Sequence, residues 1–440
     1  MRVIPEPLLA HAFGQTYNLP LPLWLFIYGG AAAVILSFVV VAFFVGSQHA
    51  NDDYLQRLVG ILPRIFVRIV AGLSVLFYAF VVLAGIAGAQ SFHDNIIPTL
   101  FWVYFLIAFA YIVFLIGNIW QFINPLKILF EFIEPHLGKQ FKPRFHYPQH
   151  LGYFPALGFY FAVIWLELLS KGWGIMPFNL SVVIIGYSLL TIIGAIMYGK
   201  DIWFRYGDFF SVFFGFFGHI SPVKYDGYKV YVRPPFVGLL DETTPAVSWL
   251  LFILFILSTT SFDGLRETAA YRIVFNVIGN ETVMLAASPL LFLAIYWLFM
   301  YIVKRIIKTE RSITELAVRF GLTLVPIAIA YHIAHYFTVL LIQGQAIIRL
   351  ASDPLGLGWN LFNTGAYVVK PGIIGAAAVW YIEIALIIIG HIAAVYLAHI
   401  VALKLFPSAK KALLSQYPIL ALMVIYTMAS LWIIAQPIVA

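Results

Sequence analysis

Long apolar runs recur along the whole chain, with short polar segments between them. Each run is long enough to cross the roughly 30 Å hydrocarbon layer of a bilayer as a helix. The pattern predicts about ten spans, with cores near residues 21–46, 65–90, 98–122, 153–171, 177–199, 246–262, 281–303, 316–342, 373–403 and 418–438. Ser312 and Glu315 add a helix-start signal before the eighth span, because Ser-x-x-Glu is a capping box. The predicted fold is an all-α, polytopic transmembrane helix bundle, with residues 1–440 as a single integral membrane domain.

The composition agrees with a membrane protein. Of the 440 residues, 62% are hydrophobic and 10% are charged, whereas soluble domains carry roughly 25% charged residues. The chain has no cysteine, which excludes disulfides, thiolate metal sites and iron–sulfur clusters. The expected partners are the lipid bilayer and other membrane or extracytoplasmic subunits, with no nucleic acid. The expected location is the plasma membrane.

The distribution of lysine and arginine predicts the orientation of the spans. With the N-terminus outside, 20 of the 26 cationic residues fall in cytoplasmic segments, as the positive-inside rule requires. The remaining six are Arg2, Lys171, Arg266, Arg272, Arg349 and Lys370. We therefore expect both termini on the extracytoplasmic side.

Two connecting segments have a character of their own. Residues 207–222 contain "GDFFSVFFGFFGHISP", which is too short to span and too aromatic to be fully solvated, so it predicts an interfacial or re-entrant helix at the cytoplasmic side. Residues 343–372 predict an extracytoplasmic connection with a short surface helix.

Four ionisable residues are predicted to lie in the outer half of the membrane. His332 and His335 are three residues apart in "AYHIAHYF", so they share one helical face. Glu383 follows on the next span at about the same depth, and Glu167 ends an outward-running span. Ionisable groups at membrane depth are costly and are therefore functional candidates.

Three interpretations of these residues remain open. His332, His335 and Glu383 suit a divalent metal ion, with Glu167 as the catalytic group that orients or deprotonates a bound water. Histidines facing one another across helices also suit haem b, in which case His391 and His399 on the last but one span become cofactor-binding candidates. The third interpretation is that these side chains only join helices by hydrogen bonds.

Several segments together resemble a known family. They include "HAFGQTYNLPLPLWL", "GNIWQFINPLK", "DPLGLGWNLFNT" and "GHIAAVYLAH", and they are spread over nearly the whole chain. They resemble a family of bacterial and archaeal multi-pass membrane proteins called fenitrothion hydrolases. The resemblance implies a membrane complex that cleaves an organophosphate triester, and it assigns no catalytic residue.

The leading functional hypothesis from the sequence is a membrane-embedded metal-site protein. It would be a subunit of a membrane complex, with hydrolytic or redox chemistry near the outer leaflet. One alternative is a respiratory-type haem b or quinone subunit that transfers electrons. The other is a transporter or channel for a small solute or ion, in which the same polar residues line the path.

Overall fold

Ten helices in the described part of the chain are long and apolar enough to cross a membrane. The computed structural model describes residues 21–44, 56–137, 142–241, 246–266, 268–406 and 408–439. Each of the ten helices overlaps one of the ten predicted spans, so the all-α, polytopic helix bundle is confirmed.

The chain divides into two compact units. The first unit comprises the described parts of Gln56–Arg233 and Thr338–Ile373, and the second those of Ala10–Leu55, Pro234–Phe337 and Ile374–Ala440. The chain passes from the second unit to the first within helix α16 (Val325–Ile342). The predicted single membrane domain over residues 1–440 is not decided by this division and stays a prediction.

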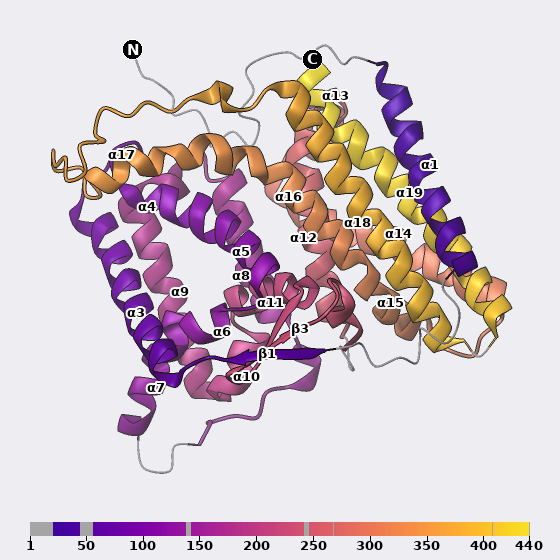
Figure 1. Cartoon of the computed structure of the whole chain (residues 1–440), viewed down its shortest axis with the longest axis horizontal. Coiled ribbons are helices and arrows are strands. Elements are labelled where there is room, and N and C mark those ends of the chain that lie inside the picture. The colour runs from indigo at the N-terminus through magenta and orange to yellow at the C-terminus, as the bar shows by residue number, and fades with distance from the viewer. Residues whose placement is uncertain are drawn as a thin grey trace. The chain divides into compact units, whose positions relative to one another are not determined.

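The first unit contains four of the spans and a small sheet (Figure 1). Its helices are α3 (Arg64–Ala87), α4 (Ile96–Pro98), the π-helix η1 (Thr99–Ala108), α5 (Phe109–Ile116), α6 (Trp120–Ile123), α7 (Pro125–Ile133), η2 (Glu134–Leu137), η3 (Gln149–Leu151), α8 (Phe154–Leu168), η4 (Trp173–Ile175), α9 (Pro177–Tyr198), α10 (Lys200–Tyr206), α11 (Phe209–Ile220), η7 (Gln343–Gln345), α17 (Ala346–Ser352) and η8 (Pro371–Ile373). Its strands are β1 (Arg57–Ile61), β2 (Val223–Asp226) and β3 (Lys229–Val232).

The three strands form an antiparallel sheet in the order β1-β3-β2. Arg57 of β1 pairs with Val232 of β3. This sheet joins two connections that the cation pattern assigns to the cytoplasm, since β1 precedes the second span and β3 follows α11. Lys200 also bonds Glu134 at 2.7 Å, between two segments assigned to the same side.

The opposite ends of the first unit's spans are joined in the same way. The amide of Ala89 donates to the carbonyl of Leu355 at 2.7 Å, and Arg349 pairs with Asp94 at 3.2 Å. Both connections are predicted to be extracytoplasmic. Loops that touch must lie on one side of the membrane, so these contacts support the way the cation pattern sorts the loops.

Helix α11 is the segment predicted as interfacial or re-entrant. Its 12 residues rise only about 18 Å, which is short of a full crossing. All six of its phenylalanines are buried in the first unit. Buried Asp208 accepts from the amide of Ser211 at its N-terminus, and buried Arg233 donates to the carbonyls of Gly218 and Ser221 at its C-terminus. Each charge complements the helix dipole at its own end. Whether α11 is interfacial or re-entrant stays a prediction.

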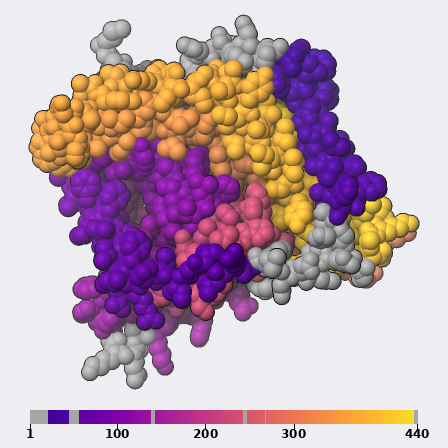
Figure 2. All heavy atoms as spheres, in the orientation of Figure 1, coloured from indigo at the N-terminus to yellow at the C-terminus, as the bar shows by residue number. Residues whose placement is uncertain are grey.

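The second unit holds the remaining spans. Its helices are α1 (Leu23–Phe44), η5 (Val237–Asp241), α12 (Val247–Arg266), α13 (Ala269–Ile278), α14 (Glu281–Ile307), α15 (Ile313–Gly321), η6 (Leu322–Leu324), the larger part of α16, α18 (Ala376–Leu405) and α19 (Ala409–Val439). Helices α1, α14 and α18 all pack against α19, and Figure 2 shows α1 in indigo along the yellow surface of the C-terminal helices. One half of the predicted capping box is present at α15, where Ser312 Oγ accepts from the amide of Glu315 at 3.0 Å, while the Glu315 carboxylate pairs with Arg311.

Helices α16 and α18 approach each other closely at Gly390. A methyl group built there would lie 2.4 Å from the Cβ atom of Ala330 and 2.8 Å from the carbonyl oxygen of Pro326. Only glycine leaves room for this contact. The contact fixes the register of the two spans, and so the relative depth of the residues on α16 and α18.

Candidate functional site

A buried pair of an aspartate and a histidine joins two spans of the second unit. Asp263 lies near the end of α12, and His335 lies in the second half of α16. His335 Nε2 is 2.8 Å from Asp263 Oδ2. An ionised carboxylate can only accept, so Nε2 carries a proton and donates it to this bond. The aspartate is buried because other helices enclose α12, in which 16 of the 20 residues are buried.

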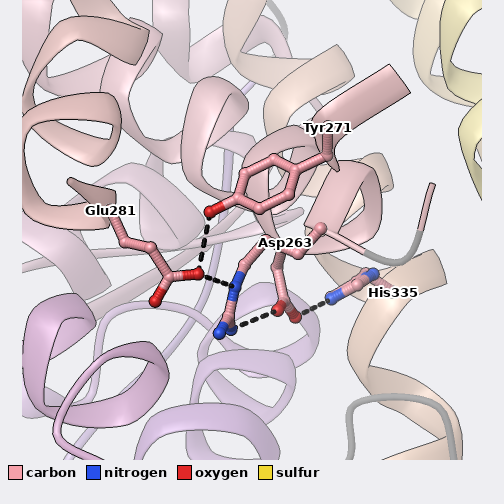
Figure 3. Close-up of polar contacts among 5 residues, drawn as sticks. Asp263, Tyr271, Glu281 and His335 are labelled. Carbon is pink, nitrogen blue, oxygen red and sulfur yellow. Dashed lines mark hydrogen bonds and ion pairs between the residues drawn. The ribbon is translucent and has the colours of Figure 1, made fainter. Parts of the chain in front are cut away.

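Contacts continue from this pair towards the surface of the protein through three further residues (Figure 3). Arg266 Nη1 lies 3.8 Å from Asp263 Oδ1, and Arg266 Nε lies 3.6 Å from Glu281 Oε1. Tyr271 Oη donates to the same Glu281 oxygen at 2.9 Å. We call Asp263, Arg266, Tyr271, Glu281 and His335 the polar chain.

The polar chain runs from a partly exposed end to a buried end. The exposed fraction of the side chain is 33% for Glu281, 27% for Arg266, 10% for Asp263 and 3% for His335. Local sequence explains the outer end: Asn280 caps α14 by accepting from the amide of Val283, which fixes Glu281 in the first turn. A carboxylate there is also favoured by the helix dipole.

Charge is not balanced along the polar chain when His335 is neutral. Two carboxylates and one guanidinium leave one negative charge, which a protonated His335 would cancel. Tyr271 does not alter this balance at neutral pH, because burial, and then its bond to Glu281, raise its pKa to about 12. The arrangement is therefore suited to hold one additional proton or other cation at its buried end.

His332 and Glu383 lie near this buried end in depth. His332 is 6% exposed and its ring packs 4.8 Å from that of Tyr336. From the Gly390–Ala330 contact, Glu383 lies about 10 Å along α18 and His335 about 8 Å along α16, both towards the predicted outer surface. The matched depth of His335 and Glu383 agrees with the expectation from sequence.

Glu383 is a buried carboxyl group with an unused oxygen. It is 8% exposed, and its Oε2 atom makes no hydrogen bond to the described residues. Tyr331 lies within electrostatic range of both Glu383 and Asp263. The structure thus gives His335 a carboxylate partner that differs from the one the sequence suggested.

The predicted metal ligands do not form a ready-made set. Within the described ranges, no three His, Cys, Asp or Glu side chains are grouped so that they could hold a metal ion. The site of His332, His335 and Glu383 stays a prediction. Glu167, its predicted catalytic partner, lies near the end of α8 in the first unit and is partly buried.

The two candidate haem ligands lie on α18 in the second unit. His391 Nδ1 bonds the carbonyl of Ile387 at 2.8 Å, and its Nε2 is buried without a hydrogen bond to any described residue. His399 Nδ1 bonds Gln416 Oε1 on α19 at 3.0 Å. Gln416 Nε2 in turn donates to the carbonyl of Ala412. His399 therefore joins two helices by hydrogen bonds, while a cofactor role for either ring stays a prediction.

Comparisons with known protein families, with curated proteins and with solved structures find no match for this chain. The resemblance to the fenitrothion hydrolases consequently stays a prediction.

Proposed function

We propose that this protein is a proton-linked transporter of a small solute or ion, with Asp263 and His335 as its proton-binding pair. The observation that supports this is the graded burial of the polar chain. Charged groups inside a membrane protein are costly, and where they occur they commonly face ion paths or proton relays. A chain of charges from the membrane surface to a buried histidine is the arrangement that a relay requires.

Each member has a role that follows from its contacts. His335 takes up and releases the proton, because its pair with Asp263 gains a full charge when the ring is protonated. Arg266 keeps Asp263 ionised when the histidine is neutral. Glu281 and Tyr271 hold Arg266 at the surface end, where a proton arrives from water. Glu383, at the same depth, is the next acceptor in the direction of α18.

Proton flux into liposomes tests the proposal. The purified protein is reconstituted with an internal pH indicator, and a potassium gradient with valinomycin drives protons inward, with and without mixtures of amino acids, sugars, organic acids and metal ions. We expect flux above that of empty liposomes, and its loss in Asp263→Asn and His335→Gln.

Thr260→Val is the matched control. Thr260 is buried on the same helix, and its hydroxyl is bonded to the carbonyl of Ile256 within that helix. This variant should keep the flux. Flux equal to that of empty liposomes in every mixture would overturn the proposal, as would flux unchanged in both Asp263→Asn and His335→Gln.

A second candidate function is metal-dependent hydrolysis of an organophosphate-like ester near the outer leaflet. Two observations favour it: the unused Oε2 atom of Glu383 at the depth of His335, and the carboxylate behind His335. Histidines that bind metals commonly donate their other ring nitrogen to such a carboxylate. His332 and Glu383 would complete the ligand set, Glu167 would serve the bound water, and further subunits would complete the complex.

Metal content and an absorption spectrum separate the two candidates. Stoichiometric metal that is lost in His332→Ala, together with cleavage of a phosphotriester, would support the hydrolase. A haem absorption band that is lost in His391→Ala would support the electron-transfer alternative instead. Proton flux without either signal is the outcome expected for the transporter.

A further inference from the structure

Helix α13 links two spans of the second unit and has an unusually exposed apolar surface. None of its ten residues is buried, and Ile273 and Val277 are 69% and 83% exposed. Ten residues rise about 15 Å, which is too short to cross the membrane. The connections at its ends are brief, since Thr268 and residue 267 separate it from α12, and Gly279 and Asn280 separate it from α14. It must therefore lie close to the surface at which both spans end.

The ends of α13 are firmly defined. Buried Thr268 accepts from the amide of Tyr271 at 3.1 Å, which caps the N-terminus. Gly279 has a φ of +69° and ends the helix in the left-handed conformation that glycine adopts readily. Both ends of the helix are thus capped.

The residues of α13 fall into three sectors around the helix axis, at 100° per residue. One sector faces the protein: the ring of Tyr271 contacts that of Phe262 on α12 at 5.8 Å and stacks on Phe275 at 6.2 Å. A second, polar sector carries Arg272 and Asn276. The third and widest sector is apolar and exposed, and consists of Ala270, Ile273, Val274, Val277 and Ile278.

We infer that α13 is an interfacial helix whose apolar sector lies among the lipids of the leaflet that the cation pattern assigns to the outside. A helix lying in the interface needs one side for lipid and one for water, and a helix docked on a bundle needs a third side for protein. Helix α13 has all three sides: the rings of Tyr271 and Phe275 for protein, the sector of Arg272 and Asn276 for water, and the apolar sector for lipid.

Continuity with a lipid-facing span identifies lipid as the occupant. Helix α13 packs against α12 and α14. Val283 in the first turn of α14 is 52% exposed, and further along the same span Leu290 and Leu291 are 59% and 60% exposed. The exposed apolar surface of a transmembrane helix thus begins next to α13. The interfacial position also holds Tyr271 against Glu281, at the outer end of the polar chain.

The absence of cysteine from the chain permits a direct test. Val277→Cys and Asn276→Cys place one thiol in the apolar and one in the polar sector, at neighbouring exposed positions. Each variant is labelled with the environment-sensitive fluorophore NBD and reconstituted into phosphatidylcholine–phosphatidylglycerol vesicles. We expect blue-shifted emission at 277 that lipid-borne doxyl groups quench several-fold more strongly than at 276. Iodide in the water should quench 276 more strongly than 277.

Two results would overturn the inference. Strong iodide quenching at 277 would show that the apolar sector faces water. Blue-shifted emission at 277 that lipid-borne quenchers do not reach would show that protein, such as a second copy or another subunit, covers it. Neither result depends on transport, so failure of this test and failure of the proposed function are distinguishable.

Discussion

Removal of Asp263 is the sharpest test of the polar chain. In Asp263→Ala, buried His335 loses the carboxylate that lies 2.8 Å away. Leaving the buried Nε2 atom of His335 without its acceptor costs up to about 3 kcal/mol. Arg266 also loses its 3.8 Å contact with Asp263 in this variant, but it keeps its 3.6 Å contact with Glu281, so most of the expected cost comes from His335. Asp263→Asn should cost less, about 1–2 kcal/mol, because an amide oxygen can still accept from the ring.

A double-mutant cycle isolates the pair from other effects of these changes. Asp263→Ala and His335→Ala are made singly and together, and the free energy of unfolding is measured by titration from detergent into denaturing mixed micelles, followed by tryptophan fluorescence. We expect a coupling energy of about 1.5–3 kcal/mol, as for hydrogen bonds to charged groups. In a control cycle that uses Thr260→Val in place of Asp263→Ala, the coupling energy with His335→Ala should be close to zero. A coupling energy near zero for Asp263 and His335 would refute the pair as the centre of the site.

Three further predictions concern other parts of the fold. Gly390→Ala should destabilise the protein by about 1–3 kcal/mol, because the added methyl group would lie 2.4 Å from a side-chain carbon of α16; unchanged thermal stability would contradict the close approach. Arg233→Met should cost about 2–3 kcal/mol in the same unfolding assay, since buried carbonyls at the end of α11 lose their donor, whereas an exposed arginine replaced in the same way should be neutral. The hydrogen bond from Ser91, and after it the contacts with Arg349, lower the pKa of Asp94 below its ordinary value of 3.8. The ionised Asp94 carboxylate therefore stabilises the fold at any pH above 3.8, and this stabilisation is lost as the pH falls through the lower pKa of the folded state. The unfolding curves of wild type and Asp94→Asn should therefore converge in acid, and a constant difference across pH would contradict the pairing.

The spans could be predicted because lipid imposes a local rule. Every crossing needs about 20 apolar residues in sequence, so a span is visible without knowledge of its neighbours. The cations of each loop likewise predict the side on which it lies, and this orientation stays a prediction. The sheet could not be found in this way. Strand β1 has only five residues and pairs with β3 far along the chain, so its stability comes from a long-range contact that sequence periodicity does not report.

Asp263 was missed for a related reason. The apolar run ends at about residue 262, so the acid falls in what reads as a loop. The structure buries it because neighbouring helices enclose α12. A signal was nevertheless present: Ser258, Thr259, Thr260 and Ser261 are four consecutive hydroxyl residues just before it. Such residues are typical of helix contacts within a bundle and not of a lipid-facing span.

The choice of partner for His335 shows what sequence spacing leaves undetermined. Counting residues predicted that Glu383 lies at the depth of His335, and the close contact at Gly390 is consistent with that register of α16 and α18. Depth alone does not select a partner, however. Asp263 has Arg266 beside it, which stabilises an ionised carboxylate and so makes it the stronger acceptor for a ring N–H. Oε2 of Glu383 has no hydrogen-bond donor among the described residues. The charge next to each carboxylate, which depends on packing and not on spacing, accounts for the pairing of His335 with Asp263.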